Sequence, residues 1–337
     1  MVAATMNRSA FLPSAPARTV GRMTDTKTAA AATAEQIEQF ISMYAAGFGA
    51  TLRSPVWHSP AEAGLDFHEI TFPSKDGVPL EGWYIPAPDS DKLIIANHPL
   101  WFSRSGLPAH IEPWKSMWAP TGNDNEVDFI PDYKILHDAG YHVLAYDLRN
   151  LGASGAANGG VISAGVYEAR DVLGSLAYVR SRPDLSHLTI GLFSRCMGAN
   201  ATMFAMRAEP AAFDGVRAMV APQPLSPRVT MEQSLVAAGI PARYIDELEQ
   251  QVRLHNGFRL DDMSPVQPAR SVNVPTLLYQ VRDDVLTRPE DVQAVYDNIT
   301  VEKDLFWIED STRRWDGYRY FAQNPGRILD WFDRHMS

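Results

Sequence analysis

Short apolar segments rich in β-branched and aromatic residues alternate with amphipathic stretches along most of this chain, from about residue 92 to residue 334. The short segments have the composition of strands, and the longer stretches repeat their apolar residues at the three- and four-residue steps of a helix. Strands joined through helices need crossover connections, so they run parallel in one sheet with helices on both faces. The pattern therefore predicts an α/β fold. The expected strands are residues 92–98, 141–147, 188–194, 216–222, 274–281 and 303–309, and the expected helices are residues 128–139, 163–181, 197–208, 289–298 and a final one near 318–334.

The sheet is expected to begin with antiparallel strands. Two β-rich runs at residues 68–72 and 80–86 flank Asp76 and Gly77, a dipeptide typical of a tight hairpin turn. Together with the later strands, this hairpin predicts a mostly parallel sheet of about eight strands.

The N-terminal region is expected to contribute a helix but no strand. Thr33 and Gln36 have capping-box spacing, and the apolar residues that follow recur on one helical face, which predicts a helix over residues 34–50. Residues 1–32 are rich in Ala, Thr, Ser and Pro and have no apolar run of the kind that a secretory signal needs. We expect a disordered or flexible tail there.

Two stretches interrupt the alternation, and both are expected to be cap-like insertions. One lies near residues 103–127. The other, near residues 226–265, is charged and helical in texture, with Pro241 and Gly257 as breaks. We therefore expect residues 33–337 to form a single domain with these two insertions, because α/β folds of this length are often single.

Composition narrows the possible partners. The hydrophobic content of 45% is enough for a large core, and no run of eighteen apolar residues could cross a membrane. The formal charge of −10 disfavours nucleic acid as a partner. The single cysteine excludes an internal disulfide and a multi-cysteine metal site, and it fits a reducing, cytoplasmic location. We expect a soluble protein with a small-molecule substrate, no metal, no redox cofactor and a possible homodimer.

The segment "GLFSRCMGAN", residues 191–200, places that cysteine, Cys196, between an expected strand and an expected helix. A sharp strand-to-helix turn makes the side chain at its summit project free of the sheet, and it needs small residues two positions before and two after. Ser194 and Gly198 meet that need. The pattern predicts that Cys196 is a nucleophile, and the alternative is a small core residue, because cysteine is often buried.

Four segments together resemble the α/β-hydrolase superfamily over about residues 65–337. The turn at Cys196 is similar to its nucleophile elbow, and the cysteine resembles the dienelactone-hydrolase branch, which uses Cys, His and Asp. The segment "YDLRNLGASG" (146–155) resembles the signature after the family's fourth strand, and "RDDVLTRPE" (282–290) resembles the turn that carries the triad acid. The segment "ANHPLWF" (96–102) stands where the family's oxyanion loop follows the third strand.

The resemblance implies Asp284 as the catalytic acid, but it leaves the base unfilled. In the family the histidine follows the eighth strand, and here Arg313 occupies that place. No histidine lies between His255 and His335. An arginine cannot accept a proton near neutral pH, because its pKa is above about 12. We therefore expect an atypical triad in which Asp284 orients Arg313.

The oxyanion hole is also expected to differ from the family's usual form. The family takes one backbone N–H from the residue after the nucleophile, here Met197, and another from the oxyanion loop. That loop reads His98-Pro99 where His-Gly is usual, and proline has no N–H. Leu100 or Trp101 must then supply the second donor.

A cysteine can act without a strong base because its thiol titrates near about 8.5, and a nearby cation or a helix N-terminus can favour the thiolate. We expect Cys196 to be stored as a thiolate beside Arg313. Release of an acyl group to water still needs a base, so hydrolysis is expected to be slow unless a histidine supplies one. His98 on the oxyanion loop is the first candidate and His255 the second.

Aromatic residues near the expected thiol could form an apolar wall for a substrate. They are Phe102, Trp114, Trp118 and Trp315. The alternative for this group is ordinary packing of an inserted loop.

The predicted function is an enzyme that acts on an ester, thioester or lactone through a Cys196 thiolate. Two alternatives stay open at this point: a non-hydrolytic enzyme of the same fold, such as an acyltransferase or carbon–carbon lyase, and a non-catalytic ligand-binding protein.

Overall fold

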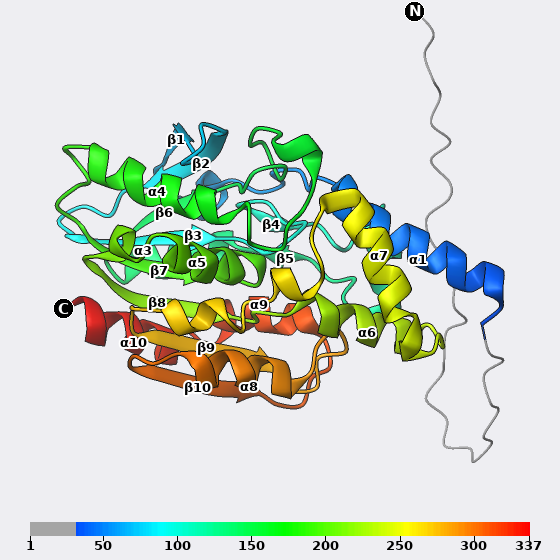
Figure 1. The fold of residues 1–337 in the computed structure, drawn as a ribbon. Helices are drawn as coiled ribbons and strands as arrows, with labels where there is room; N and C mark the ends of the chain where they lie inside the picture. The colour runs from blue at the N-terminus through cyan, green and yellow to red at the C-terminus, as the bar shows by residue number, and fades with distance from the viewer. Residues whose placement is uncertain (1–31) are drawn as a thin grey trace, which may run out of the picture.

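The computed structural model describes residues 32–337, which form an eight-stranded sheet flanked by helices (Figure 1). The flexible tail predicted for residues 1–32 lies, apart from its last residue, outside the described part of the chain. The strand order is β1-β2-β6-β3-β7-β8-β9-β10. The strands of this sheet are β1 (His68–Pro73), β2 (Pro79–Ile85), β3 (Lys92–Asn97), β6 (His142–Tyr146), β7 (Thr189–Ser194), β8 (Val216–Pro222), β9 (Thr276–Val281) and β10 (Lys303–Ile308).

The strand directions agree with the sequence prediction. β2 is antiparallel to both of its neighbours, β1 and β6, and all later neighbours in the sheet are parallel. Parallel strands send their carboxyl ends to the same edge of a sheet, where ligands commonly bind. The segments that follow β3, β7, β8 and β9 therefore meet at one edge.

The helices that were given limits from the sequence begin and end close to them, with two exceptions. No helix within residues 32–337 is both long enough and apolar enough to cross a bilayer. The α-helices are α1 (Ala34–Gly49), α2 (Trp114–Trp118), α3 (Ile130–Asp138), α4 (Ala169–Ser181), α5 (Met197–Ala208), α6 (Pro227–Ala237), α7 (Ile245–Asn256), α8 (Pro289–Asn298), α9 (Arg314–Gln323) and α10 (Gly326–Met336).

Both exceptions have a backbone cause. The helix predicted over 163–181 begins only at Ala169, because Ala164 and Gly165 have φ values of 49° and 123°, which no right-handed helix contains. The final helix predicted near 318–334 is two helices, α9 and α10. Pro325 lies between them, and proline cannot continue a helix.

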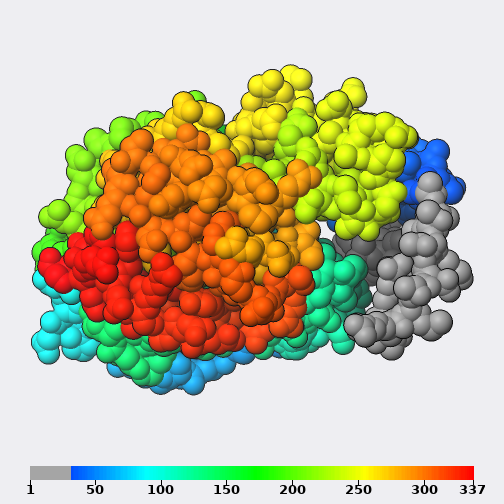
Figure 2. Space-filling model, turned by 90° about the horizontal axis from the view of Figure 1, so that it is seen from below, coloured from blue at the N-terminus to red at the C-terminus, as the bar shows by residue number. Residues whose placement is uncertain are grey.

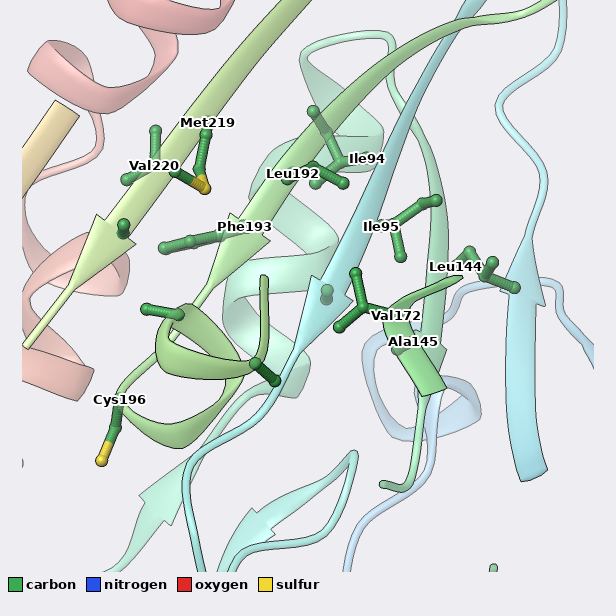
Figure 3. Packing of buried hydrophobic residues seen from close by; sticks show 14 of the residues in the cluster. Ile94, Ile95, Leu144, Ala145, Val172, Leu192, Phe193, Cys196, Met219 and Val220 are labelled. Atoms are coloured by element: carbon green, nitrogen blue, oxygen red, sulfur yellow. The ribbon is translucent and has the colours of Figure 1, made fainter. Parts of the chain in front are cut away.

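The main core lies around the parallel strands, which are buried on both faces. All five residues of β6 are buried, as are the last five of β7. Figure 3 shows apolar side chains of β3, β6, β7 and β8 packed against one another. This explains why the strands read as nearly continuous apolar runs in the sequence instead of alternating ones.

A second, smaller core joins the N-terminal helix to the insertion after β8. One apolar face of α1 packs against α7, and α6 completes the group. Figure 1 shows α1, α6 and α7 gathered at one end of the molecule, and Figure 2 shows the same end in blue and in yellow-green to yellow; we call this group the cap. The stretch near 226–265, predicted as a cap-like insertion, contains α6 and α7, and α1 packs against it. The buried side chains of this core are Ile37, Ile41, Ala45, Phe48, Ala164, Met231, Leu235, Ile240, Leu248, Val252, Leu260 and Met263.

Candidate active site

Cys196 occupies the sharp turn between β7 and α5. Its φ of 53° and ψ of −114° are a conformation that costs a non-glycine residue on the order of 1 to 3 kcal/mol. Its amide donates a hydrogen bond of 2.9 Å to the Pro222 carbonyl, which fixes the turn against the end of β8. Figure 3 shows the sulfur pointing away from the apolar side chains of the strands. The thiol therefore projects from the carboxyl edge of the sheet.

The small residues on either side of Cys196 are required by close packing against the end of β3. A Cβ added at Gly198 would lie 2.7 Å from the Asn97 carbonyl oxygen, a distance at which backbone must move. The Ser194 hydroxyl is fully buried and accepts a hydrogen bond of 2.8 Å from Asn97 Nδ2. The elbow is thus held against the segment that leads into the expected oxyanion loop.

Arg314 is the cation beside Cys196. Its guanidinium donates to Asp284 Oδ2 at 2.6 Å, to the Tyr318 hydroxyl at 2.8 Å and to the Gln223 carbonyl. Only 2% of Arg314 and 6% of Cys196 are exposed. A buried cation held on three sides in this way has little freedom to leave the thiol.

The prediction of Arg313 at this place is wrong by one residue. Arg313 precedes the first turn of α9 with an extended backbone, and 45% of its side chain is exposed. Its Nε donates to Asp316 at 3.1 Å. Arg314 opens the helix itself, and its side chain turns inward toward Asp284. Which of the two neighbours faces the thiol is set by the residue at which α9 begins.

Asp284 lies in the turn after β9, where the resemblance places the acid. Its carboxylate is 3% exposed and accepts hydrogen bonds from four donors. Besides Arg314 these are the Leu286 amide at 2.9 Å, the Thr287 hydroxyl at 3.2 Å and the Gln280 amide at 3.2 Å. This set of donors fixes the position of the carboxylate beside Arg314.

The surroundings of Arg314 and Tyr318 keep both side chains protonated. Burial alone would lower the pKa of the Arg314 guanidinium, but the nearby phenol, thiol and carboxylate raise it well above its ordinary value. Burial raises the pKa of the Tyr318 phenol well above its ordinary value, although Arg314 lowers it and Cys196 raises it further. The site therefore contains one permanent cation and one neutral phenol in contact with the sulfur.

Three backbone N–H groups, one on the elbow and two on the loop after β3, are not used in hydrogen bonds in the described part of the chain. Within residues 32–337, the amides of Met197, Leu100 and Trp101 donate no hydrogen bond. Trp101 has a φ of 67°, so the loop after β3 turns sharply at this point. The Phe102 amide donates to the Pro99 carbonyl at 3.3 Å and closes that turn. Free amides on both the elbow and the loop are what an oxyanion hole requires.

The expectation that His98 supplies the base is contradicted by its hydrogen bonds. Its Nε2 accepts from the Leu148 amide at 2.9 Å, and its Nδ1 donates to the Pro99 carbonyl at 2.7 Å. Both ring nitrogens are therefore occupied. Burial lowers the pKa of His98, which is 2% exposed, so the ring stays neutral. His98 pins the loop after β3 and is not free to accept a proton.

His255 is no substitute, because it lies exposed on α7, where its ring contacts Gly49 of α1. All nine histidines of the chain lie within residues 32–337, and none is hydrogen-bonded to Cys196, Asp284 or Arg314. Any base for the second half of an acyl transfer must therefore be another group.

Three of the four aromatic residues predicted to line a substrate, Phe102, Trp118 and Trp315, pack together in one cluster with Trp101. Trp118 packs against Trp101 and Trp315, with ring centroids 5.2 and 4.8 Å apart. The indole N–H groups of Trp118 and Trp315 are buried without an acceptor in the described part of the chain. Phe102 is fully buried beneath Trp315, and Trp114 is 3% exposed on α2. Trp118 and Trp315 are buried as well, with exposures of 7% and 3%, so the group also has the form of ordinary aromatic packing.

A second buried arginine lies next to Cys196 in the sequence. The Arg195 guanidinium donates to Asp132 Oδ2 of α3 at 2.6 Å and lies 3.7 Å from the ring centroid of Phe193 and 4.3 Å from that of Phe129. Burial raises the pKa of Asp132 to about 7, although Arg195 lowers it. No short sequence motif marks this pair.

Two further residues of the site, Tyr318 and Gln223, also lie outside any short motif. Arg314 and Tyr318 are four residues apart, so a helix that begins at residue 314 places both on one face. That spacing is the one signal from which the pairing could have been predicted.

Comparisons with known proteins agree with this geometry at the level of the fold. No protein-family model matches the chain, and no curated protein matches it. Among solved structures, the esterase Pf2001 of Pyrococcus furiosus matches with a TM-score of 0.62 and 21% identity, over 86% of this chain and 100% of that one. The α/β hydrolase GrgF of Penicillium sp. sh18 matches with a TM-score of 0.54 and 18% identity, over 81% and 99%. The hypothetical protein PA2218 of Pseudomonas aeruginosa matches with a TM-score of 0.53 and 16% identity, over 85% and 99%. The chain has the α/β-hydrolase fold.

Proposed function

We propose that this α/β-hydrolase-fold protein is an enzyme that takes an acyl group from a small or medium ester, thioester or lactone and carries it as a thioester on Cys196. The observation that supports this most is the position of Cys196 at a strained elbow beside Arg314, a buried cation held by three hydrogen-bond partners. A thiol that served only to fill the core would need neither the strained backbone nor the cation.

In this proposal Arg314 favours the thiolate form of Cys196. A buried guanidinium next to sulfur stabilises the anion and disfavours the neutral thiol. Asp284 holds Arg314 in place, so it is a positioning residue in this site. The enzyme therefore needs no base for the first attack on the carbonyl carbon.

The amides of Met197 and of Leu100 or Trp101 would stabilise the oxyanion that forms during this attack. Removal of one such donor commonly costs about 10²- to 10³-fold in rate. The side chains of Trp101, Trp118 and Trp315 would face the acyl or alcohol portion of the substrate, which favours apolar groups there. The description of Pf2001 as an esterase supports ester substrates for this chain as well.

Acyl transfer to an acceptor other than water is a second candidate function, as in an acyltransferase. It is favoured by the hydrogen bonds of His98, which leave no free imidazole near the thiol to activate water. A thiol or amine acceptor attacks a thioester with less help from a base than water needs.

The test is intact-mass analysis after incubation with p-nitrophenyl butyrate. The wild-type protein should gain one butyryl group on Cys196, and Cys196→Ala should gain none above the background of lysine acylation. The acceptor is then identified by adding water alone, a small thiol or a small amine and following loss of the adduct. A wild-type protein that shows neither an adduct nor turnover dependent on Cys196 with any of several activated esters would contradict the proposal and leave a ligand-binding role.

A further inference from the structure

Tyr318 shares the buried site with Cys196 and Arg314. It lies one turn after Arg314 on α9, is 1% exposed, and packs in edge contact against Phe102 with ring centroids 5.3 Å apart. Its hydroxyl oxygen accepts a hydrogen bond of 2.8 Å from Arg314 Nε. Since that oxygen is already an acceptor, its own proton must be donated elsewhere, and the sulfur of Cys196 is the hydrogen-bonding group beside it.

We propose that Tyr318 is a catalytic residue that moves the proton in both halves of the reaction, giving it to the departing alcohol and later removing one from water. This inference rests on the proposed acyl-enzyme at Cys196. Tyr318 would thereby perform the proton transfers for which the site has no free histidine.

The first half-reaction forms the thioester at Cys196. The thiolate attacks the carbonyl carbon, a carbon–sulfur bond forms, and the carbonyl electron pair moves to oxygen. When this oxyanion collapses, the carbon–oxygen bond to the alcohol breaks, and the departing oxygen takes the proton of Tyr318. The alcohol leaves, and the enzyme holds a thioester at Cys196 and a phenolate at Tyr318.

The second half-reaction restores both groups. The phenolate takes a proton from water while the water oxygen attacks the thioester. The new oxyanion collapses, the carbon–sulfur bond breaks, and its electron pair returns to sulfur as thiolate. The sum is an ester and one water converted to an acid and an alcohol, with no oxidation or reduction.

The electrostatics of the site support a phenolate at the acyl-enzyme stage and disfavour it before. In the free enzyme the anionic sulfur and the phenol share one cation, and Cys196 raises the pKa of Tyr318. Acylation removes the negative charge from sulfur, whereas Arg314 keeps its charge and its hydrogen bond to the phenol oxygen. The cation is then free to balance a phenolate.

The other charged group within reach cannot take this task. The Asp284 carboxylate accepts from four donors, three of them on Oδ2 with Arg314 among these, so it is engaged in holding the cation.

The experiment compares Tyr318→Phe with the matched control Tyr279→Phe. Tyr279 is a buried phenol on β9 whose hydroxyl has no partner among residues 32–337, so its removal should not touch the chemistry. Two esters are used. With p-nitrophenyl butyrate the leaving group departs without a proton, so Tyr318 must lose its proton to solvent before deacylation, whereas with ethyl butyrate the leaving group takes the proton of Tyr318.

With p-nitrophenyl butyrate, Tyr318→Phe should keep the burst of p-nitrophenol and then accumulate the butyryl-enzyme, with steady-state turnover at least about 100-fold below wild type. With ethyl butyrate, acylation itself should also slow by about 100-fold or more. Tyr279→Phe should match wild type with both esters. Discharge of the adduct from Tyr318→Phe at the wild-type rate would overturn the role of Tyr318 alone, whereas a wild-type protein with neither an adduct nor turnover that depends on Cys196 would overturn the proposed function.

If Tyr318→Phe does not fold, incorporation of 3,5-difluorotyrosine at position 318 replaces it, because this residue keeps the hydroxyl but is more acidic. The charged and titratable groups that face the phenol are Arg314, Cys196 and Asp284. In the acyl-enzyme Cys196 is blocked, and Arg314 stays charged. The pH dependence of deacylation should therefore shift to lower pH, and an unshifted profile would overturn the proposal.

Discussion

Two buried arginine–aspartate pairs lie next to Cys196, and they differ in how completely their hydrogen bonds are satisfied. Arg314 and Asp284 have a partner for nearly every polar atom, including backbone and side-chain groups from three elements. Arg195 and Asp132 make one hydrogen bond to each other, and within residues 32–337 Arg195 Nε, Arg195 Nη1 and Asp132 Oδ1 have no partner.

Because of this difference, the Arg314–Asp284 pair keeps its charges, whereas Asp132 of the second pair can become neutral by taking up a proton. A fully hydrogen-bonded buried ion pair retains its charges, whereas an incompletely bonded one carries a desolvation cost that favours neutralisation. The raised pKa of Asp132 is the result of that cost. We infer that the first pair serves the thiol and that the second anchors the elbow to α3 with aromatic rings around its cation.

The largest expected effect is that of Arg314→Met, which removes the cation beside the thiol. The rate of butyryl-adduct formation should fall by about 10³-fold, on the scale by which activation of a catalytic group commonly contributes. The free energy of unfolding should also fall by about 3 to 5 kcal/mol, because Asp284 is left buried without its cation. Intact mass over time and urea unfolding measure the two effects.

Arg313→Met is the matched control for that variant. Its side chain is exposed and pairs only on the surface, so adduct formation should stay within about twofold and stability within about 0.5 kcal/mol of wild type. Equal losses in the two variants would contradict the assignment of Arg314.

The next effect is that of Arg195→Met, which leaves Asp132 without its cation. At pH 8 the unfolding free energy should fall by about 3 to 5 kcal/mol. Burial keeps the pKa of Asp132 above the ordinary 3.8, so the folded protein holds a proton that the unfolded chain has lost. Stability of this variant should therefore decrease as pH rises from about 4 through 7, and urea unfolding between pH 5 and pH 8 checks the sign.

The same variant separates anchoring from chemistry, because the Cys196 adduct should still form within about tenfold of the wild-type rate under conditions where the variant is folded. The double variant Arg195→Met/Asp132→Leu should recover much of the lost stability and most of the pH dependence should vanish. A loss of adduct formation as deep as that of Arg314→Met would erase the distinction between the two pairs.

A smaller effect is expected of His98→Gln, which tests whether the site depends on an imidazole at all. Loss of the fixed ring should cost about 1 to 3 kcal/mol at pH 8, because the Leu148 amide loses its acceptor. Since burial lowers the pKa of His98, the unfolded chain binds a proton more readily, and this residue makes wild-type stability fall as pH drops below about 6.5. The difference between variant and wild type should shrink toward pH 5.

Activity of His98→Gln should remain within about tenfold of wild type, as expected for a residue that positions a loop. A loss of deacylation of about 100-fold with unchanged acylation would instead identify His98 as the base, on the scale at which general bases contribute.

The smallest expected effect is on stability in Tyr279→Phe. The phenol lies near Arg195 and Asp132, but its hydroxyl is buried without a partner. Removal of an unsatisfied buried hydroxyl should change the unfolding free energy by less than about 1 kcal/mol, and the change can be in the stabilising direction. A clear destabilisation in urea would mean that a water or another group satisfies this hydroxyl.

The parts of the molecule that follow from local pattern were predictable from the sequence. The strands, the elbow at Cys196 and the helical character of the cap depend on the spacing of apolar residues, Gly and Pro over ten to twenty positions. The turn that carries Asp284 followed from a short segment that resembles a known one.

The contacts that define the site were not predictable in the same way. Whether residue 313 or residue 314 faces Cys196 depends on a helix boundary, and boundaries are the least certain part of a sequence-based assignment. The partner of His98 is the amide of Leu148, a main-chain group that has no residue-specific signal and lies 50 positions away. Tyr318 meets Cys196 only because α9 returns to the carboxyl edge of the sheet.

The partnership of α1 with α7 has a consequence for how the polypeptide is made. A ribosome that has finished Gly49 must add nearly the whole sheet before it reaches Ile245, where α7 begins. At translation rates of about 5 to 20 residues per second, that delay lasts on the order of ten to forty seconds. Throughout that time the apolar face of α1 has no partner helix to pack against. The nascent chain therefore exposes an apolar surface that chaperones can bind before the cap forms.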